Sequence, residues 1–271
     1  MGVAAADKCV MSLSASAPSA AIDRVKAFWE ALPCGAKHAS SPEGTREFFT
    51  EVEQRRYELE PFIAQYAGFA QTTGKRVLEI GVGLGTDFVQ FVRAGANATG
   101  VDLTEHGVRL VRRRLALEGL DADVLVADAE QLPFPDDHFD VVFAWGVLHH
   151  TSDPDAAIRS ALRVLRPGGR LCVMVYARRS WVAFGLWFRY ALLRGRPWHT
   201  LTNVVSHHME SEGTRAYTLR ELRERFGQLE DLSIQHVGTP YDRRVAGKVA
   251  AITADRLGWF LVVTGRAAAA G

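Results

Sequence analysis

The sequence has few cysteines, almost no net charge and no long apolar run, and each absence excludes a class of protein. Cys9, Cys34 and Cys172 are an odd number without metal-ligand spacing, so we expect neither a disulfide framework nor a cysteine-bound metal. This cysteine usage favours a cytoplasmic location. The formal net charge of +1 gives no electrostatic argument for a nucleic-acid partner, and we expect none.

Neither a transmembrane helix nor a signal peptide is expected. The longest apolar stretch, residues 181–193, is too short to span a bilayer and contains Arg189, so we expect no stable membrane insertion. Residues 1–20 are mostly small, but Asp7 and Lys8 interrupt any apolar core. We therefore expect residues 1–20 to form a disordered tail rather than a signal peptide.

From about residue 75, short apolar runs alternate with amphipathic segments, which predicts an α/β fold with a mostly parallel sheet and helices on both faces. The seven predicted strands are residues 76–80, 98–101, 123–127, 139–145, 170–176, 232–238 and 259–265. Helices are expected at 86–94, 105–117 and 155–165, where apolar residues recur at helical spacing. We assign residues 74–271 to this domain.

Two regions interrupt the alternation of strands and helices. Residues 21–73 are expected to form an N-terminal helical cap. Residues 178–216 form an insertion longer than an ordinary connection, which we expect to act as a lid. Its apolar side chains are Trp181, Phe184, Trp187, Phe188 and Tyr190. Extra packing, a dimer interface or a membrane-facing patch are the alternatives, and the sequence does not distinguish a monomer from a homodimer.

A glycine-rich turn, EIGVGLGTD at residues 79–87, follows the first predicted strand and opens a helix. Gly81, Gly83 and Gly85 let the backbone turn sharply and approach a ligand, although such a turn also serves as a plain tight connection. Asp102 ends the next strand about 20 residues on, where an acid can hold ribose hydroxyls. The pair predicts a ligand that contains a nucleoside.

The charges around the turn distinguish between nucleoside ligands. A dinucleotide would place its diphosphate at the start of the helix. Glu79 and Asp87 flank that position and would repel it, and Thr86 stands where glycine or alanine is usual. S-adenosylmethionine carries a sulfonium and an ammonium group instead, and both cations suit an acidic pocket. The electrostatics favour S-adenosylmethionine over a nicotinamide or flavin nucleotide.

The segments VLEIGVGLGTD, GVDLT, ADAEQLPFPDDHFDVVFAWGVLHH and LRPGG resemble successive motifs of class I S-adenosylmethionine-dependent methyltransferases. The resemblance covers about residues 70–180, and it is to the bacterial small-molecule branch related to ubiquinone/menaquinone-biosynthesis enzymes. It implies a Rossmann-like domain, S-adenosyl-L-methionine as cofactor and a small-molecule acceptor. EGTRAYTLRELRERF and TPYD resemble the same branch more weakly.

The resemblance also implies roles for single residues. The glycine turn, with Glu79, Gly81, Gly83 and Gly85, would surround the methionine portion and the ribose. Asp102 would take both ribose hydroxyls, although it could instead cap a helix. The adenine amino group would bond Asp128, with the Ala129 backbone nearby, and Trp145 would lie beside the sulfonium. The predicted cofactor site also includes Tyr57, Asp87, Leu103 and Glu130. An acid in the first turn of a helix is favourable without any ligand, so Asp87 has that alternative.

Methyl transfer requires alignment, exclusion of water and, for a hydroxyl acceptor, a general base. His149 and His150 follow the fourth strand and are the candidate bases, with Tyr176 as a further catalytic residue. Each histidine could instead bond backbone groups in the turn. No third ligand accompanies the pair, so we expect no metal. The run of residues 112–114, three arginines, is expected to be a solvated helix face.

The sequence therefore predicts an enzyme, an S-adenosylmethionine-dependent methyltransferase that acts on a small, apolar or aromatic acceptor. Two hypotheses stay open beside it. One is another reaction of the same cofactor, such as an intramolecular cyclisation. The other is a non-catalytic protein that binds the cofactor. Neither the acceptor nor the methylated atom can be derived from these residues.

Overall fold

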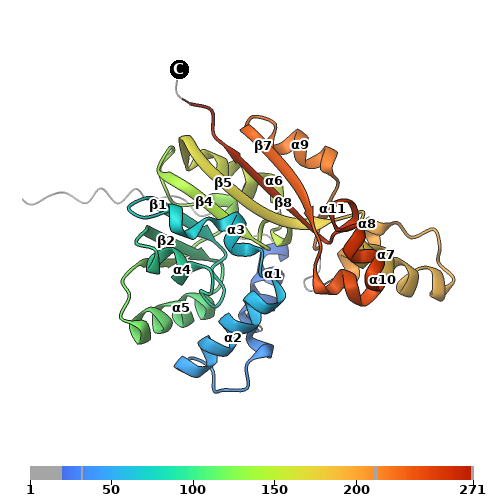
Figure 1. The fold of residues 1–271 in the computed structure, drawn as a ribbon, viewed down its shortest axis with the longest axis horizontal. Coiled ribbons are helices and arrows are strands. Elements are labelled where there is room, and N and C mark those ends of the chain that lie inside the picture. The colour runs from blue at the N-terminus through green and yellow to red at the C-terminus, as the bar shows by residue number, and fades with distance from the viewer. Residues whose placement is uncertain (1–19, 32, 210–212, 270–271) are drawn as a thin grey trace, which may run out of the picture.

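The computed structural model describes residues 20–31, 33–209 and 213–269, which are arranged around a single mixed sheet (Figure 1). The strands follow the order β3-β2-β1-β4-β5-β8-β7, and β6 pairs with β5 beside this path. Only β8 runs antiparallel to its neighbours β5 and β7. The strands are β1 Arg76–Ile80, β2 Asn97–Asp102, β3 Asp123–Val126, β4 Phe139–Trp145, β5 Leu165–Ala177, β6 Ala216–Tyr217, β7 Glu230–Val237 and β8 Phe260–Arg266.

The seven predicted strands are confirmed, six of them within two residues at each end, and the first and the fourth of these without any difference. β5 is longer than predicted and begins at Leu165, because a register shift against β4 admits the turn around Gly168. The preceding helix ends at Arg163 rather than at residue 165. β6 was not predicted, since two residues are too few to show an alternating pattern. The expected tail, residues 1–19, lies outside the described part of the chain.

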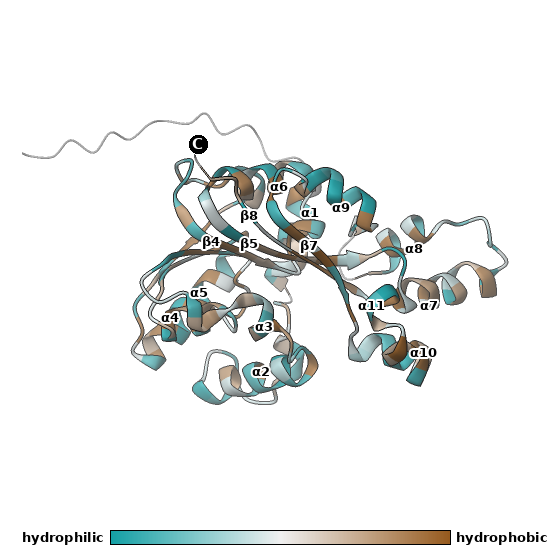
Figure 2. Ribbon diagram, turned by 45° about the horizontal axis from the view of Figure 1, so that its top comes forward, coloured by the Kyte–Doolittle hydropathy of each residue, from teal (hydrophilic) through white to brown (hydrophobic). Residues whose placement is uncertain are grey.

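Helices cover both faces of the sheet, as Figure 2 shows, with α6 and α9 on one face and α3, α4 and α5 on the other. A second group, α7, α8, α10 and α11, gathers at one end of the molecule (Figures 1 and 2). The helices are α1 Ala20–Ala31, α2 Arg46–Leu59, α3 Ile63–Ala67, α4 Phe88–Arg93, α5 Glu105–Glu118, α6 Pro154–Arg163, α7 Trp181–Tyr190, α8 Leu201–His208, α9 Leu219–Phe226, α10 Pro240–Ile252 and α11 Ala254–Leu257.

The core lies in two layers because neighbouring residues of a strand point to opposite faces. On β4, Phe143 and Trp145 join the cluster that packs under α4 and α5. Val142, which precedes Phe143, and Ala144, which follows it, join the cluster under α6 and α9. Both faces are buried, which is why this strand is apolar at nearly every position. Because both faces of the sheet are buried, a ligand site can form at the carboxyl ends of the parallel strands.

The N-terminal helices pack on the sheet domain through α2. Thr45 caps α2 by accepting a hydrogen bond from Phe48 N at 3.2 Å. Phe49 and Val52 bury their side chains against Leu110 of α5 in a small separate cluster. The residues expected to form the cap thus have their own apolar contact with the main domain. The boundaries predicted for that cap remain a prediction.

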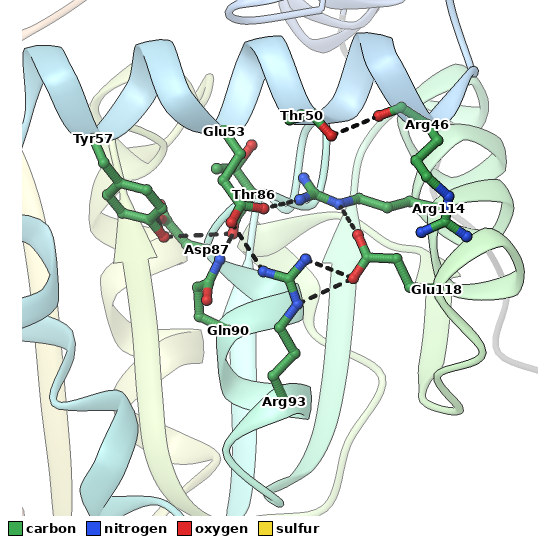
Figure 3. Close-up of polar contacts among 10 residues, drawn as sticks. All are labelled: Arg46, Thr50, Glu53, Tyr57, Thr86, Asp87, Gln90, Arg93, Arg114 and Glu118. Carbon is green, nitrogen blue, oxygen red and sulfur yellow. Dashed lines mark hydrogen bonds and ion pairs between the residues drawn. The ribbon is translucent and has the colours of Figure 1, made fainter.

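A network of charged side chains also joins α2 to α4 and α5 (Figure 3). Arg114 of α5 is 1% exposed and bonds Glu53 of α2 and Glu118 of its own helix. Arg93 of α4 binds the same two acids, at 2.9 and 2.7 Å. The prediction that residues 112–114 form a solvated face is therefore wrong for Arg114. Because α2 covers this face of α5, the third arginine of the run is enclosed.

We predict that Arg114→Leu destabilises the protein by about 2–4 kcal/mol, because it removes a buried cation and leaves two carboxylates with fewer partners. Arg113→Leu, one residue earlier and exposed, is the matched control. It should change the free energy of unfolding by less than about 0.5 kcal/mol. Urea unfolding of both variants measures the difference. Equal stabilities would show that the network in Figure 3 contributes nothing to the docking of α2.

Candidate functional site

A cavity of about 400 Å³ lies at the carboxyl ends of β1, β2 and β4. Its lining contains Ile80, Asp102 and Trp145, the last residues of these strands. The N-terminal helices close another side, with residues such as Trp29 of α1 and Arg56 of α2. Ligands of open parallel sheets bind at this end of the strands, so the cavity is the candidate site.

The glycine turn forms the wall of the cavity after β1. Gly81 has a φ of 77°, and a Cβ on it would lie 2.3 Å from Val147 Cγ2, so only glycine fits. Gly81 and Gly83 line the cavity, and their contact with a cofactor stays a prediction. Gly85 does not. A Cβ on Gly85 would lie 3.0 Å from Val111 of α5, so this glycine allows the turn to pack closely on that helix.

Asp102 both shapes the turn and lines the cavity. Its Oδ2 accepts a hydrogen bond from Gly83 N at 2.9 Å, and its Oδ1 accepts from Thr104 N and Oγ1 at 2.9 and 2.6 Å. Asp102 does not cap α5, because the N-cap of that helix is Thr104, whose side chain accepts from Gly107 N. A carboxylate accepts about four hydrogen bonds, so acceptor capacity remains toward the cavity. Leu103 beside it also lines the cavity.

Asp128, Ala129 and Glu130 follow β3 and line the cavity next to the glycine turn. Asp128 Oδ1 accepts from Glu130 N at 2.9 Å, which caps a short 3-10 turn. Burial raises the pKa of the Asp128 carboxyl. The Glu130 carboxylate accepts from Ser152 Oγ and Asp153 N, so its Oε1 has a structural role in the loop before α6.

Glu79 is a buried acid of the cavity. It is 4% exposed, and its Oε2 has no hydrogen-bond partner among the described residues. Burial, and then the nearby carboxylate of Asp87, raise the pKa of Glu79 well above its ordinary value, against the opposing effect of Arg56. A buried acceptor without a partner is costly, and a donor or cation in the cavity would relieve that cost.

Asp87 is held by α2. Arg56 bonds its Oδ2 at 2.6 Å, and the Tyr57 hydroxyl donates to its Oδ1 at 2.9 Å (Figure 3 draws the tyrosine). Burial, followed by Asp87, raises the pKa of Tyr57. Asp87 and Arg56 line the cavity, but Tyr57 does not. The structure therefore places Tyr57 behind Asp87, where it positions that carboxylate. Arg56 was missed, because one arginine on a charged helix carries no motif.

The overall charge of the lining is negative. Arg56 and Lys37 are its Lys and Arg side chains, against six carboxyl side chains, namely Glu60, Glu79, Asp87, Asp102, Asp128 and Glu130. An excess of acids attracts a cation and repels a diphosphate. The residues present thus fit S-adenosylmethionine, with the open Oε2 of Glu79 as the clearest place for a cationic donor. Within the described residues, no group of three or more His, Cys, Asp or Glu side chains has the arrangement of a metal site.

Beyond these acids the lining becomes aromatic. Trp145 donates from Nε1 to Glu60 Oε2 at 2.8 Å, which fixes its ring at the end of β4. Tyr176 of β5 stacks on Trp259 and Phe260 with ring centroids 4.3 and 5.9 Å apart. All four rings line the cavity, and Trp29 of α1 adds a fifth. One end of the cavity is therefore suited to a flat or apolar molecule.

The two adjacent histidines have different surroundings. His150 lines the cavity, its Nδ1 lies 3.0 Å from Thr214 Oγ1, and its ring meets Trp29 edge to face. Burial lowers the pKa of His150 to about 3. His149 is fully buried outside the lining, against Tyr176, and neither ring nitrogen has a partner among the described residues. Burial, and next His150, lower the pKa of His149 well below its ordinary value.

The insertion of residues 178–216 contributes little to the lining. Val182 and Met209 line the cavity, but none of the five aromatic residues that were expected to cap it does. Trp181 instead donates to Oγ1 of Thr253, the residue after α10, at 2.8 Å, and Trp187 donates to His199 O at 2.7 Å. Most of the cover comes from α1, α2 and their connection, while a lid role for residues 178–216 remains a prediction.

A protein-family model described as a methyltransferase domain matches residues 78–173. The chain is 42% identical over 113 residues to a ubiquinone/menaquinone biosynthesis C-methyltransferase of Azotobacter vinelandii, which covers 40% of this chain and 44% of that protein. A Pseudomonas aeruginosa protein of the same name is 43% identical over 115 residues, with the same shares. The similarity thus spans less than half the length of these relatives.

Solved structures share the fold at low sequence identity. The cyclase SpnF is 22% identical with a TM-score of 0.56, over 92% of this chain and 94% of that one. A putative methyltransferase of Haloferax volcanii, solved with the methyltransferase activator Trm112, is 19% identical with a TM-score of 0.56, over 81% and 97%. Haemonchus contortus phosphoethanolamine N-methyltransferase 2, solved with S-adenosylhomocysteine, is 20% identical with a TM-score of 0.56, over 76% and 53%.

We predict that Glu79→Gln has opposite effects on stability and on ligand binding. Because the folded pKa is raised, the native state keeps a proton that the unfolded chain has lost above pH about 4.5. Stability therefore falls as pH rises between the unfolded and the folded pKa. The variant has no such loss, so without ligand it should melt higher than the wild type at pH about 7.5.

The same change should weaken binding of S-adenosylhomocysteine about tenfold or more, because a charge-assisted hydrogen bond is worth about 1.5–3 kcal/mol. Calorimetry measures the affinity and thermal melting the stability. Glu105→Gln, on the exposed start of α5, is the control and should alter neither. An unchanged affinity in Glu79→Gln would remove Glu79 from the binding site.

Proposed function

We propose that this chain, whose residues 78–173 form a class I S-adenosylmethionine-dependent methyltransferase domain, transfers a methyl group to a small apolar or aromatic acceptor. One observation supports the proposal most strongly. A single cavity is lined by acids and a glycine turn at one end and by stacked aromatic rings at the other. Such a cavity can hold a cationic nucleoside donor beside a flat acceptor. The cysteine usage supports a cytoplasmic location for this activity.

The acidic end would hold the cofactor, which supplies a methyl group activated by its sulfonium. Glu79 would bind the cationic methionine portion, because its Oε2 is buried and has no partner among the described residues. Asp102 would accept from the ribose hydroxyls with its remaining acceptor capacity, and Asp128 from the adenine amino group. Arg56 would keep Asp87 paired, so that the turn carries less repulsion.

The aromatic end would bind and align the acceptor. Tyr176, Trp259 and Phe260 form a stacked wall, and Trp145 lies between this wall and the acids. Alignment of the acceptor atom with the methyl group can contribute about 7–11 kcal/mol to lowering the barrier. A largely apolar end also excludes water, which protects the activated methyl group from hydrolysis. Among the described residues, these rings are the feature that favours an aromatic acceptor.

For a hydroxyl acceptor, His150 would serve as general base. Burial lowers its pKa to about 3, so the ring is neutral at physiological pH and a weak base, and it would act on a hydroxyl that loses its proton as the methyl group is transferred. Thr214 Oγ1 orients the ring through Nδ1, which turns the other nitrogen away from Thr214. His149 does not line the cavity, so we do not assign it a role in proton transfer.

The fold alone does not determine the reaction, because it is shared by the cyclase SpnF as well as by methyltransferases. We propose to separate the alternatives by incubating the protein with S-adenosylmethionine alone and with a panel of phenols, quinols and aromatic amines. Mass spectrometry should detect S-adenosylhomocysteine and a methylated product only when an acceptor is present. Methylthioadenosine without any acceptor would indicate attack on the methionine chain, and binding without turnover across the panel would favour a non-catalytic protein.

We predict that His150→Phe lowers turnover of a hydroxyl acceptor by about 10²–10⁴-fold with little change in S-adenosylhomocysteine affinity. Phenylalanine keeps the edge-to-face contact with Trp29 but cannot take a proton. His149→Phe is the matched control and should keep turnover within a few-fold of the wild type. The wild-type rate should also not fall between pH 8 and pH 6 through His150 protonation, since its pKa is about 3. Equal losses in both variants would assign the pair to packing alone.

A further inference from the structure

Large apolar side chains are exposed on two neighbouring segments at one end of the molecule. The first, α7 and the loop after it, exposes Phe188, Leu192, Leu193 and Trp198. The second, α10, exposes Val245, Val249 and Ile252. Elsewhere in the described residues, the one exposed large apolar side chain is Val126, at the other end of the sheet. Exposed apolar residues that cluster in this way mark a surface that binds something.

The two segments form one continuous surface. A Cβ on Gly185 of α7 would lie 3.0 Å from Val245 Cγ1, so the two helices are in direct contact. Figures 1 and 2 show α7 and α10 together at the end of the molecule where β7 and β8 enter that group of helices. The brown colour of apolar residues appears on both helices in Figure 2. We call these seven residues and the cations among them the apolar-basic surface.

The charge on this surface has one sign. Its cations are Arg189, Arg194, Arg196, Arg243, Arg244 and Lys248, all exposed. None of them has a carboxylate within ion-pair distance among the described residues. Residues 178–209 contain no Asp or Glu at all. On α10, Asp242 is buried in a capping box with Thr239, and on α11, Asp255 faces Arg256 at 3.8 Å.

The surface is ordered rather than loosely attached. Trp187 donates to His199 O at 2.7 Å, which ties the loop after α7 back to the helix. Tyr190 stacks on His208 of α8 with centroids 4.0 Å apart, and the guanidinium groups of Arg189 and Arg194 lie over the Tyr190 ring. These contacts hold in place the segment that carries the exposed apolar side chains.

We propose that the apolar-basic surface docks the protein on a membrane that contains anionic phospholipids. Segments that lie in the interface of a bilayer combine apolar side chains, often with Trp among them, with Arg and Lys. The apolar-basic surface has this composition. The cations would bind lipid phosphates, while Trp198 and Ile252, 72% and 80% exposed, would enter the headgroup region. Among the described residues, no helix has the length and hydropathy needed to cross a bilayer.

A second copy of the chain is a less suitable occupant. Two copies related by a two-fold axis would bring the same cations together without acids to pair them. An anionic lipid surface supplies negative charge to pair with the Arg and Lys side chains of the apolar-basic surface. The charge complementarity thus selects the membrane over self-association.

Vesicle flotation with the full chain tests the proposal. The protein should float with vesicles of phosphatidylcholine containing about one third phosphatidylglycerol, and far less with phosphatidylcholine alone. Raising the salt concentration from about 0.05 to 0.5 M should weaken binding about fivefold or more, because exposed charges are screened. Equal binding to both kinds of vesicle, or no binding to either, would overturn the proposal.

Paired variants locate the contact. Leu193→Ser with Trp198→Ser, and separately Arg194→Glu with Arg196→Glu, should each reduce binding to anionic vesicles about tenfold or more. Val126→Ser and Arg159→Glu are matched exposed controls away from the surface and should bind as the wild type does. Each variant should keep its melting shift with S-adenosylhomocysteine, which shows that it is folded. Loss of binding in the controls would contradict the assignment, as would a dimer in solution that Leu193→Ser with Trp198→Ser dissolves.

Discussion

The pairing of Arg56 with Asp87 is the contact on which the rest of the site depends. Asp87 and Glu79 lie on the same turn, and two unpaired carboxylates there would repel each other in a region with little solvent. Arg56 neutralises Asp87 from α2, and Tyr57 completes the set of donors to that acid. Glu79 is thereby left as the acid with an open acceptor oxygen. This oxygen is the hydrogen-bond acceptor that remains available to a ligand.

The same pairing couples the N-terminal helices to the cavity. α2 is held on α5 by an apolar cluster and by the Arg114 network, which Figure 3 draws. These contacts bring Arg56 of α2 to within 2.6 Å of Asp87 on the glycine turn. The connection between α1 and α2 and α1 itself then cover the opening, with Trp29 reaching the aromatic end. The acids and the aromatic rings of the cavity are thus enclosed by one segment, which the main domain holds through apolar contacts and ion pairs.

The strands and the order of the site acids could be predicted from the sequence because each rests on a local pattern. Residues 139–145 are apolar without interruption since both faces of β4 are buried, and Asp102 and Asp128 follow strand ends. Two-residue β6 has no pattern to detect. Arg114 was expected in solvent because it belongs to a run of three arginines, and the packing of α2 encloses it. Arg56 was missed for the same reason, because its importance comes from a residue 31 positions away.

The place of the aromatic side chains of residues 178–216 could not be predicted from composition. These aromatic rings were expected over the cavity, yet they face α8, α10 and the exterior. Among the described residues of this segment, Val182 and Met209 are the ones that line the cavity. Val182 and Tyr241 begin α7 and α10 at the cavity, and the later turns of these helices carry the apolar-basic surface. α7 and α10 therefore contribute to both the cavity and the apolar-basic surface, so they connect a membrane bound at that surface to the cavity.

The central claim is that the acidic end of the cavity binds a cationic nucleoside and rejects a diphosphate. Calorimetric titration of the purified protein with S-adenosylmethionine, S-adenosylhomocysteine and NAD, without added metal, tests this most directly. We predict binding of the first two and no measurable binding of NAD, because the excess of acids in the lining repels phosphate. Tighter binding of NAD than of either sulfur nucleoside would contradict it.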